Sequence, residues 1–321
     1  MFALRQFLTI ARLTALEAIR QPLAFLLFAS VLMLIALMPL ILSHTLGESA
    51  KFVRDGALAL MWVSGLVLGA HLACASLFSE IRRGTVSAVL SKPIQRPLFF
   101  LAKFAGIAAV MIAFASGLLM AVLISARTAR QAYLVDWWSA WPFITAIVGA
   151  FILGGLINFF LRRPFVSNAF AWLFLLLGLA FLFVGFIDQN GRLTVFGTLY
   201  DFRIIPAGSL ITLAILVLAG ISVALATRLK TIPTLSICGA VFLLGLLSDY
   251  YFGRWAETHG LASFLYRITP NWQHFWVVDA LAGDGQIPYS YVGLSAGYAL
   301  LYLAGVLLIG MVAFQRMEVQ A

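Results

Sequence analysis

The charged residues of this 321-residue chain follow a readable order in one segment, residues 79–97, which reads SEIRRGTVSAVLSKPIQRP between two long apolar runs. On a helix, Glu80 and Arg83 would share one side, because residues three and four apart lie on the same face. Gly84 would let another backbone approach closely, and Pro93 would end the helix. This order is typical of a surface on which something outside the apolar region acts, and a solvated loop would not need it.

Motifs of nucleotide and metal chemistry are missing from the sequence. The chain has no G-x-x-x-x-G-K-[ST] loop, the usual cradle for the phosphates of ATP. It has no H-E-x-x-H motif and no Cys/His cluster with metal-ligand spacing, and its four histidines are scattered. We therefore expect a chain that is not an enzyme, binds no cofactor itself and does not hydrolyse ATP alone. Cys74 and Cys238 fall in apolar runs and suggest no disulfide.

The composition sets the fold class that must position the charged segment. Hydrophobic residues make up 63% of the chain and charged residues 10%, with a mean hydropathy of +1.03; a soluble domain carries about 25% charged residues. We expect an all-α integral membrane protein, a polytopic bundle of about eight transmembrane helices, with six to eight as the range. The expected spans are residues 22–43, 56–79, 104–126, 137–161, 164–187, 204–227, 231–248 and 287–314. The seventh is the shortest and would reach only about 27 Å.

Lysine and arginine predict the orientation of these spans. Of the 21 Lys and Arg residues, 13 fall on the side of the amino terminus and 8 on the other. Because positive charge accumulates on the cytoplasmic side, both termini are expected to be cytoplasmic, in a multi-pass protein of the cell (inner) membrane. The net charge of +9 is then mostly a topology effect, so lipid is an expected partner and nucleic acid is not.

One membrane domain is expected to cover residues 1–321, with two special segments besides residues 79–97. Residues 1–21 predict an amphipathic helix in the membrane interface, or alternatively a basic tail that only sets topology. Residues 249–286 are rich in aromatic side chains and predict two short interfacial or re-entrant helices, separated at Pro270 and Asn271. We expect Asn271 to cap a helix beginning at Trp272. The region would be either an outer gate over a substrate path or an anchoring belt.

Small and polar residues inside the spans leave further alternatives open. The GxxxG pairs Gly65/Gly69 and Gly293/Gly297, with a weaker Ala150/Gly154 pair, predict close helix packing within one chain or between two. His71 is expected to be a packing histidine rather than a proton relay. Asn158 would be interhelical glue or a boundary residue. No ring of charges points to a particular substrate, since the expected cavity walls are Leu, Phe, Ala and Gly.

The charged segment resembles a family pattern, E-x-x-x-G-T-x-x-x-L-L-S-x-P-[IV]-x-R, which follows the second span in type 2 ABC exporter permeases. The matching positions are Glu80, Gly84, Thr85, Leu90, Ser91, Pro93, Ile94 and Arg96. Val89 stands where leucine is usual. Residues 268–281 are more loosely similar to the outer region of gliding-type and copper-maturation-type permeases. Family members commonly have six spans, so two extra spans leave the subfamily and the substrate open.

The resemblance implies that residues 79–97 form a coupling helix seated on a separate ATPase subunit, which would hold ATP and magnesium. It also implies two permeases in the transporter, as a homodimer or a pseudo-dimer with another permease. Glu80, Arg82, Arg83 and Thr85 would touch the ATPase, and Gly84 would allow close contact. The coupling residues implied in all are Glu80, Arg82, Arg83, Gly84, Thr85, Leu90, Ser91, Pro93 and Arg96.

Two other functions stay open from the sequence. An ion-driven secondary transporter would move its substrate without a partner and would use His71. A non-transporting membrane scaffold would move nothing across the bilayer.

Overall fold

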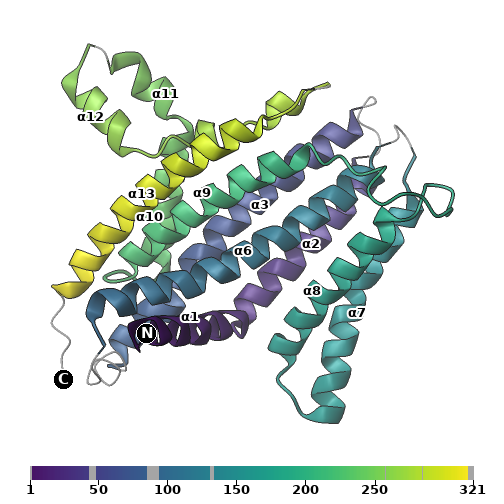
Figure 1. Ribbon diagram of the computed structural model, residues 1–321, viewed down its shortest axis with the longest axis horizontal. Helices are drawn as coiled ribbons and strands as arrows, with labels where there is room; N and C mark the ends of the chain where they lie inside the picture. Colours follow the sequence, from purple (N-terminus) through teal and green to yellow (C-terminus); the bar gives the residue numbers. More distant parts are fainter. Residues whose placement is uncertain are drawn as a thin grey trace.

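Long helices make up the architecture of the chain (Figure 1). The computed structural model describes residues 2–42, 48–84, 94–130, 134–256, 258–283 and 285–316. Seven helical stretches among them are long and apolar enough to cross a membrane: α2 (Pro22–Ile41), α3 with its extension (Ser49–Arg82), α6 (Arg96–Thr128), α7 (Trp137–Leu161), α8 (Phe165–Gly185), α9 (Ile204–Leu225) and α13 (Tyr289–Gln315). The described residues contain no strand, only an isolated bridge between Ile187 and Leu193. The chain is thus a helical membrane protein by length and composition.

The expected seventh span is a broken helix. Helix α10 (Thr231–Leu246) has 16 residues and is followed, after a bend of 63°, by Ser248–Trp255, which contains α11 (Ser248–Tyr251) and the short helix η2 (Gly253–Trp255). Counting this pair as one span gives the expected eight, and leaving it out gives seven. The bend explains why the apolar run looked too short, because about 24 Å of helix is less than the hydrocarbon thickness.

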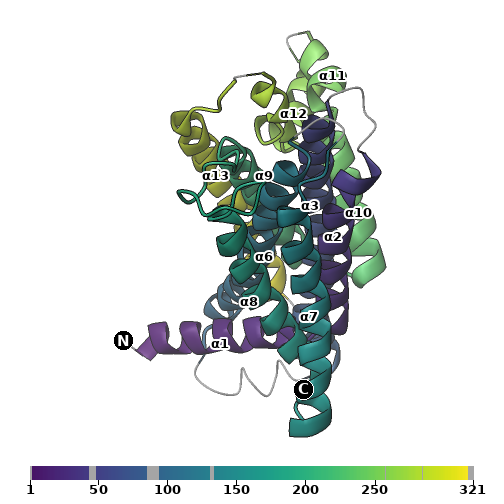
Figure 2. The ribbon, with the colours of Figure 1, turned by 90° about the vertical axis from the view of Figure 1, so that its right-hand side faces the viewer.

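Helix α1 (Phe2–Ile19) lies across the ends of the long helices, nearly at right angles to them (Figure 2). Thr14 and Ala18 on one face are buried, whereas Leu4, Leu8 and Leu13 are exposed. An exposed leucine row beside basic residues suits a helix lying in a membrane interface. We call the end of the bundle that carries α1 the α1 end, and the other the opposite end. The last turn of α13 returns to the α1 end, where Arg96 Nη1 donates to the carbonyl of Gln315 at 2.9 Å.

Helix α6 is the central element of the bundle. It contacts α1, α2, α3, α7, α8, α9 and α13. Its contact with α1 is made at Gly106, where a Cβ atom would stand only 2.5 Å from the carbonyl oxygen of Ala11 and 2.7 Å from Cβ of Thr14. Any side chain at this position would therefore push α1 away from the bundle.

The aromatic region is partly core and partly surface. Asn271 caps the short helix η3 (Trp272–His274), as expected, by accepting a hydrogen bond from the amide of Gln273 at 3.0 Å. Trp272 and Phe275 are fully buried, and Trp62 of α3 packs edge to face on Trp272. These two side chains therefore belong to the protein core. Exposed aromatics gather instead before and within α12 (Gly260–Ile268): Tyr250, Tyr251, Trp255 and Phe264. A further short helix, η4 (Val278–Leu281), precedes α13.

Two of the three small-residue pairs pack within the chain. Gly69 faces Ala219 of α9 and Gly65 faces Ile215 of the same helix. Gly154 of α7 faces Ala169 of α8, which closes the α7–α8 hairpin seen at the right of Figure 1. In α13, by contrast, a Cβ atom on Gly293 or Gly297 would meet no described atom within 4 Å.

The close approach at Gly106 gives a test of how α1 is held. Gly106→Ala is expected to lower the free energy of unfolding by about 1–3 kcal/mol, because the new methyl group overlaps the backbone of α1. Gly239→Ala in α10 is the matched control, since a Cβ atom there meets nothing within 4 Å; it should be neutral or stabilising by up to about 1 kcal/mol. Unfolding of the purified protein in a denaturing detergent series, followed by tryptophan fluorescence, measures both. Equal effects of the two changes would contradict the packing of α1 on α6.

Candidate functional site

The charged segment begins where α3 changes its winding. Helix α3 (Ser49–Ala73) passes into a π-helical turn, η1 (Cys74–Phe78), and then into α4 (Ser79–Arg82). Cys74 Sγ lies 3.5 Å from Thr234 Oγ1 and 3.8 Å from the carbonyl oxygen of Leu229, so the π turn is seated on the start of α10. π turns inside α-helices are frequent at functional sites, because the extra residue shifts the helix register.

A buried ammonium joins this turn to two other helices. Lys103 of α6 is only 4% exposed, and its Nζ lies 2.6 Å from Glu80 Oε1 in α4 and 3.8 Å from Glu17 Oε2 in α1. The same Nζ lies 5.7 Å from the ring centre of Phe99, close enough for a cation–π contact. Because a buried ammonium is costly without a counter-charge, Glu80 is a partner that Lys103 requires. Helices α1, α4 and α6 are thus tied together at one point.

Helix α4 ends at Arg82, and Gly84 follows two residues later. The amides of Arg83 and Gly84 donate to the carbonyls of Ser79 and Ile81, and Gly84 has a φ of +69°. A left-handed residue of this kind ends helices, and glycine adopts it without steric cost. Gly84 therefore acts as a helix terminator. A Cβ atom on Gly84 would meet no described atom of this chain within 4 Å, and the expected close contact with an ATPase subunit stays a prediction.

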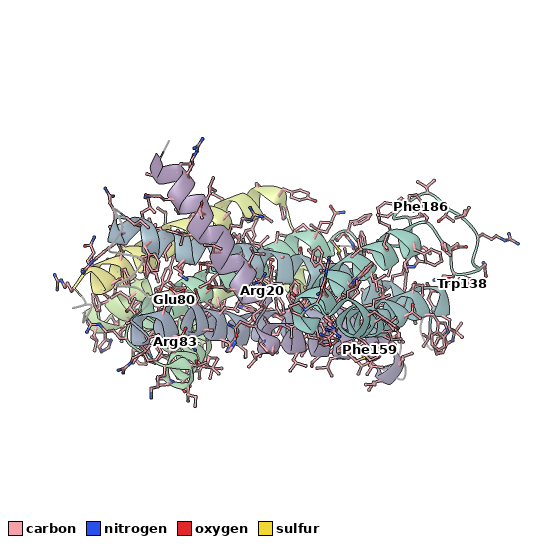
Figure 3. All side chains as sticks on the ribbon, turned by 90° about the horizontal axis from the view of Figure 1, so that it is seen from below. Arg20, Glu80, Arg83, Trp138, Phe159 and Phe186 are labelled. Atoms are coloured by element: carbon pink, nitrogen blue, oxygen red, sulfur yellow. The ribbon has the colours of Figure 1, made fainter. Side chains whose placement is uncertain are left out.

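The predicted coupling residues divide into four groups. Glu80 faces Lys103 and is bound within the chain, whereas Arg82 and Arg83 are exposed, with Arg82 stacked 5.4 Å from the ring centre of Phe78. Arg96 begins α6 and reaches the end of α13. The other expected positions lie outside the described residues: Thr85, Leu90, Ser91 and Pro93. Figure 3 shows Glu80 and Arg83 close together near α1, and Trp138 and Phe186 at the other end of the molecule.

Sequence reasoning missed Lys103 and Glu17 as parts of this site. Both were visible as charges, Lys103 at the start of an expected span and Glu17 in the expected interfacial helix, but both were interpreted only in terms of topology. A lysine inside an apolar helix, one turn or more from its end, was the available indication that a carboxylate must be near.

Other polar residues singled out in the spans have local roles. Asn158 Nδ2 donates to the carbonyl of Arg163 at 2.7 Å, so Asn158 is a boundary residue that holds the α7–α8 turn. His71 Nε2 is buried and has no hydrogen-bond partner among the described residues.

Two observations bear on catalysis. Residues 293–297 read G-L-S-A-G and so match the G-x-S-x-G motif, but Ser295 lies buried inside α13 rather than on the strand-to-helix turn that a nucleophile elbow needs. Among the described residues, no group of three or more His, Cys, Asp or Glu side chains is arranged to hold a metal ion. Neither observation provides a reacting centre.

Comparison with known proteins adds no family assignment: no protein-family model and no curated protein matches the chain.

The Lys103 contacts predict a strong energetic coupling. Lys103→Met should lower the free energy of unfolding by about 3–5 kcal/mol, because it leaves Glu80 partly buried beside an apolar side chain. Adding Glu80→Gln should recover part of that loss. Detergent-induced unfolding of the two single variants and the double variant measures the coupling as a double-mutant cycle.

The control is the exposed pair Lys51 and Glu48, whose charged atoms are 3.8 Å apart with side chains 47% and 61% exposed. Lys51→Met with Glu48→Gln should show a coupling of less than about 1 kcal/mol. Additive effects of Lys103→Met and Glu80→Gln would show that the buried contact does not hold α4 to α6.

Proposed function

We propose that this chain is the membrane permease subunit of an ATP-driven transporter of the type 2 ABC class, working as an exporter. The observation that carries the proposal is the exposed pair Arg82 and Arg83 at the end of α4. This short helix continues α3 through the π turn and is tied by Glu80 and Lys103 to α1 and α6. A permease driven by a separate ATPase needs a rigid segment of this kind, because the ATPase can act on the segment and move the helices joined to it. The pattern of residues 80–96 supports the same assignment.

In this proposal the chain spans the cell (inner) membrane, and its α1 end faces the cytoplasm. The partner ATPase binds ATP with magnesium and closes on it, and the movement reaches residues 79–97. Glu80 then does not serve mainly as an ATPase contact, because its carboxylate already binds Lys103. It passes the displacement to α6 and α1, while Arg82 and Arg83 make the contact with acidic groups of the ATPase.

A second permease is also part of the proposal. Only 17% of the most apolar stretch of α13 is buried. A Cβ atom on Gly293 or Gly297 would meet no described atom within 4 Å. Small residues on an exposed membrane helix let another helix approach closely. This surface supports a homodimer, or a pseudo-dimer with a related permease.

One observation favours a second candidate, an ion-driven carrier. The buried Nε2 of His71 makes no hydrogen bond to a described residue, and an intramembrane histidine of this kind can carry protons. That function predicts transport by the chain alone in vesicles with a proton gradient, and loss of transport in His71→Asn.

The ATP-driven function is tested with two arginine pairs of equal charge at the α1 end. Arg82→Gln with Arg83→Gln should reduce the ATPase activity of the purified complex about tenfold or more, because loss of two charges at an interface removes a few kcal/mol of contact energy. Arg162→Gln with Arg163→Gln is the matched control, since these two arginines are also exposed and adjacent, in the α7–α8 turn. It should leave the activity near that of the wild type.

The measurement begins with purification of the full chain from native membranes and a search for a P-loop protein that accompanies it. Failure of any such protein to co-purify, or an equal effect of both arginine pairs, would contradict the proposed function. Glu80 is unsuitable for this test, because its substitution also breaks the contact with Lys103.

A further inference from the structure

A cavity of about 620 Å³ opens at the end opposite α1, between the first turn of α3, the last turn of α6 and the segments that lead into α9 and α13. This end lies at the upper right of Figure 1. Five cationic side chains line the cavity, although the sequence suggested no ring of charges. They are Lys51, Arg54, Arg127, Arg130 and Arg203, and two carboxylates, Glu48 and Asp201, line it as well.

Two of these arginines hold the walls together. Arg127 Nε lies 3.2 Å from Asp136 Oδ2, and its two terminal nitrogens donate to the carbonyls of Val184 and Ile187 at the end of α8. Arg203 donates to both oxygens of Asp201 at 2.8 and 3.0 Å and to the carbonyl of Gly283 at 3.0 Å. These hydrogen bonds hold the cavity walls in place. They use most of the N–H groups of the two arginines, so few remain to bind a ligand.

Asp201 is likewise committed to the wall. Burial by itself would raise the pKa of Asp201, but the hydrogen bonds and charge of Arg203 outweigh it and hold that pKa below its ordinary value. Asp201 therefore stays a carboxylate at neutral pH, with its charge balanced by Arg203.

Arg54 is the residue whose bonding is incomplete. It is 7% exposed, its Nε lies 2.8 Å from Asp55 Oδ1, and its Nη1 donates to the carbonyl of Leu281 at 3.1 Å. Its Nη2 is buried and finds no acceptor among the described residues. Buried donors are nearly always paired, because an unpaired one loses its hydration without compensation. Because Arg54 also lines the cavity, an anion bound there is one acceptor that this guanidinium could use.

Two further cations surround the same space. Lys51 lies one helical turn before Arg54, so both project from one face of α3. Arg130 follows the end of α6, where it donates to the carbonyl of Leu199 at 3.1 Å. None of the described carboxylates lies within ion-pair distance of Arg130. Lys51 has a neighbour in Glu48, at 3.8 Å, but an exposed pair of this length binds weakly.

We propose that this cavity is a binding site for a phosphate-type anion, a phosphate mono- or diester, held by Arg54, Lys51 and Arg130. A phosphate offers several acceptor oxygens in different directions, which three separate donors around one space can reach together. Arginine binds such oxygens through its planar guanidinium, and lysine attracts them through the charge of its ammonium. The anion would supply Arg54 Nη2 with its acceptor after a small turn of the guanidinium. The proposal does not depend on the function proposed above, since it concerns only this chain.

The phosphate can belong to a soluble compound or to a lipid headgroup, and the experiment separates the two. The full chain is purified in a neutral detergent, and its thermal unfolding is followed as inorganic phosphate replaces chloride at constant ionic strength. In parallel, the protein is placed in nanodiscs of phosphatidylglycerol mixed with phosphatidylcholine, and native mass spectrometry counts the phosphatidylglycerol molecules it retains. Saturable stabilisation by phosphate identifies a soluble ligand class, and selective retention of phosphatidylglycerol identifies a lipid headgroup.

Three variants connect the binding to the cavity. The rim variant, Lys51→Gln with Arg130→Gln, changes two exposed residues of the cavity, of which Arg130 also donates to the carbonyl of Leu199. Arg54→Lys keeps the charge but removes the guanidinium fork. Both should weaken whichever binding the wild type shows by tenfold or more. Arg192→Gln is the matched control, because Arg192 is exposed in the segment between α8 and α9 but does not line the cavity; it should bind as the wild type does.

Binding of neither probe by the wild type would overturn the proposal. Equal binding by the wild type and the rim variant would overturn it as well. If Arg54→Lys fails to fold, the rim variant still decides, because its two side chains lie at the cavity mouth. Loss of ATPase coupling in the arginine pair at the α1 end would not affect any of these results.

Discussion

The ammonium of Lys103 constrains how the helices at the α1 end pack, because an ammonium that is 4% exposed is costly without a counter-charge. Glu80 and Glu17 supply the counter-charge from two different elements, so the position of α6 determines where α4 and α1 lie. Gly106, one turn further along α6, then allows α1 to lie flat on the bundle. The contact of Lys103 with Glu17 and the close approach at Gly106 therefore both hold α1 against α6.

Helices α3 and α6 connect the two ends of the molecule. At the α1 end, α4 in the extension of α3 carries Glu80 and α6 carries Lys103; at the opposite end, α3 carries Arg54 and α6 carries Arg127. The arginines at the two ends differ in exposure and in bonding. Arg82 and Arg83 are exposed, whereas Arg127 is buried and bonded to the end of α8. A displacement of the extension of α3 would therefore act on a helix that also forms a wall of the cationic cavity, which links the proposed drive to the proposed anion site.

The long helices and the interfacial helix could be predicted from the sequence, because continuous apolar runs and amphipathic spacing are local properties of the chain. Asn271 as a helix cap was predicted for the same reason. The partners of Lys103 could not be predicted, since Glu80 is 23 residues away and meets it only through the packing of α3 on α6. The burial of Trp272 also depends on long-range packing, against Trp62 and α10, whereas its aromatic neighbours Tyr250 and Trp255 stay exposed. The cationic cavity brings together charged residues from three parts of the chain, which were interpreted only as outer-side charges.

The most direct test of the role of Lys103 is hydrogen–deuterium exchange of the purified full chain, comparing the wild type with Lys103→Met. If Lys103 holds α1 and α4 to α6, amides of Phe2–Ile19 and Ser79–Arg82 should exchange faster in the variant, while those of α7 and α8 keep their rates. Unchanged exchange in α1 and α4 would contradict the account, because these helices would then be held without the buried ammonium.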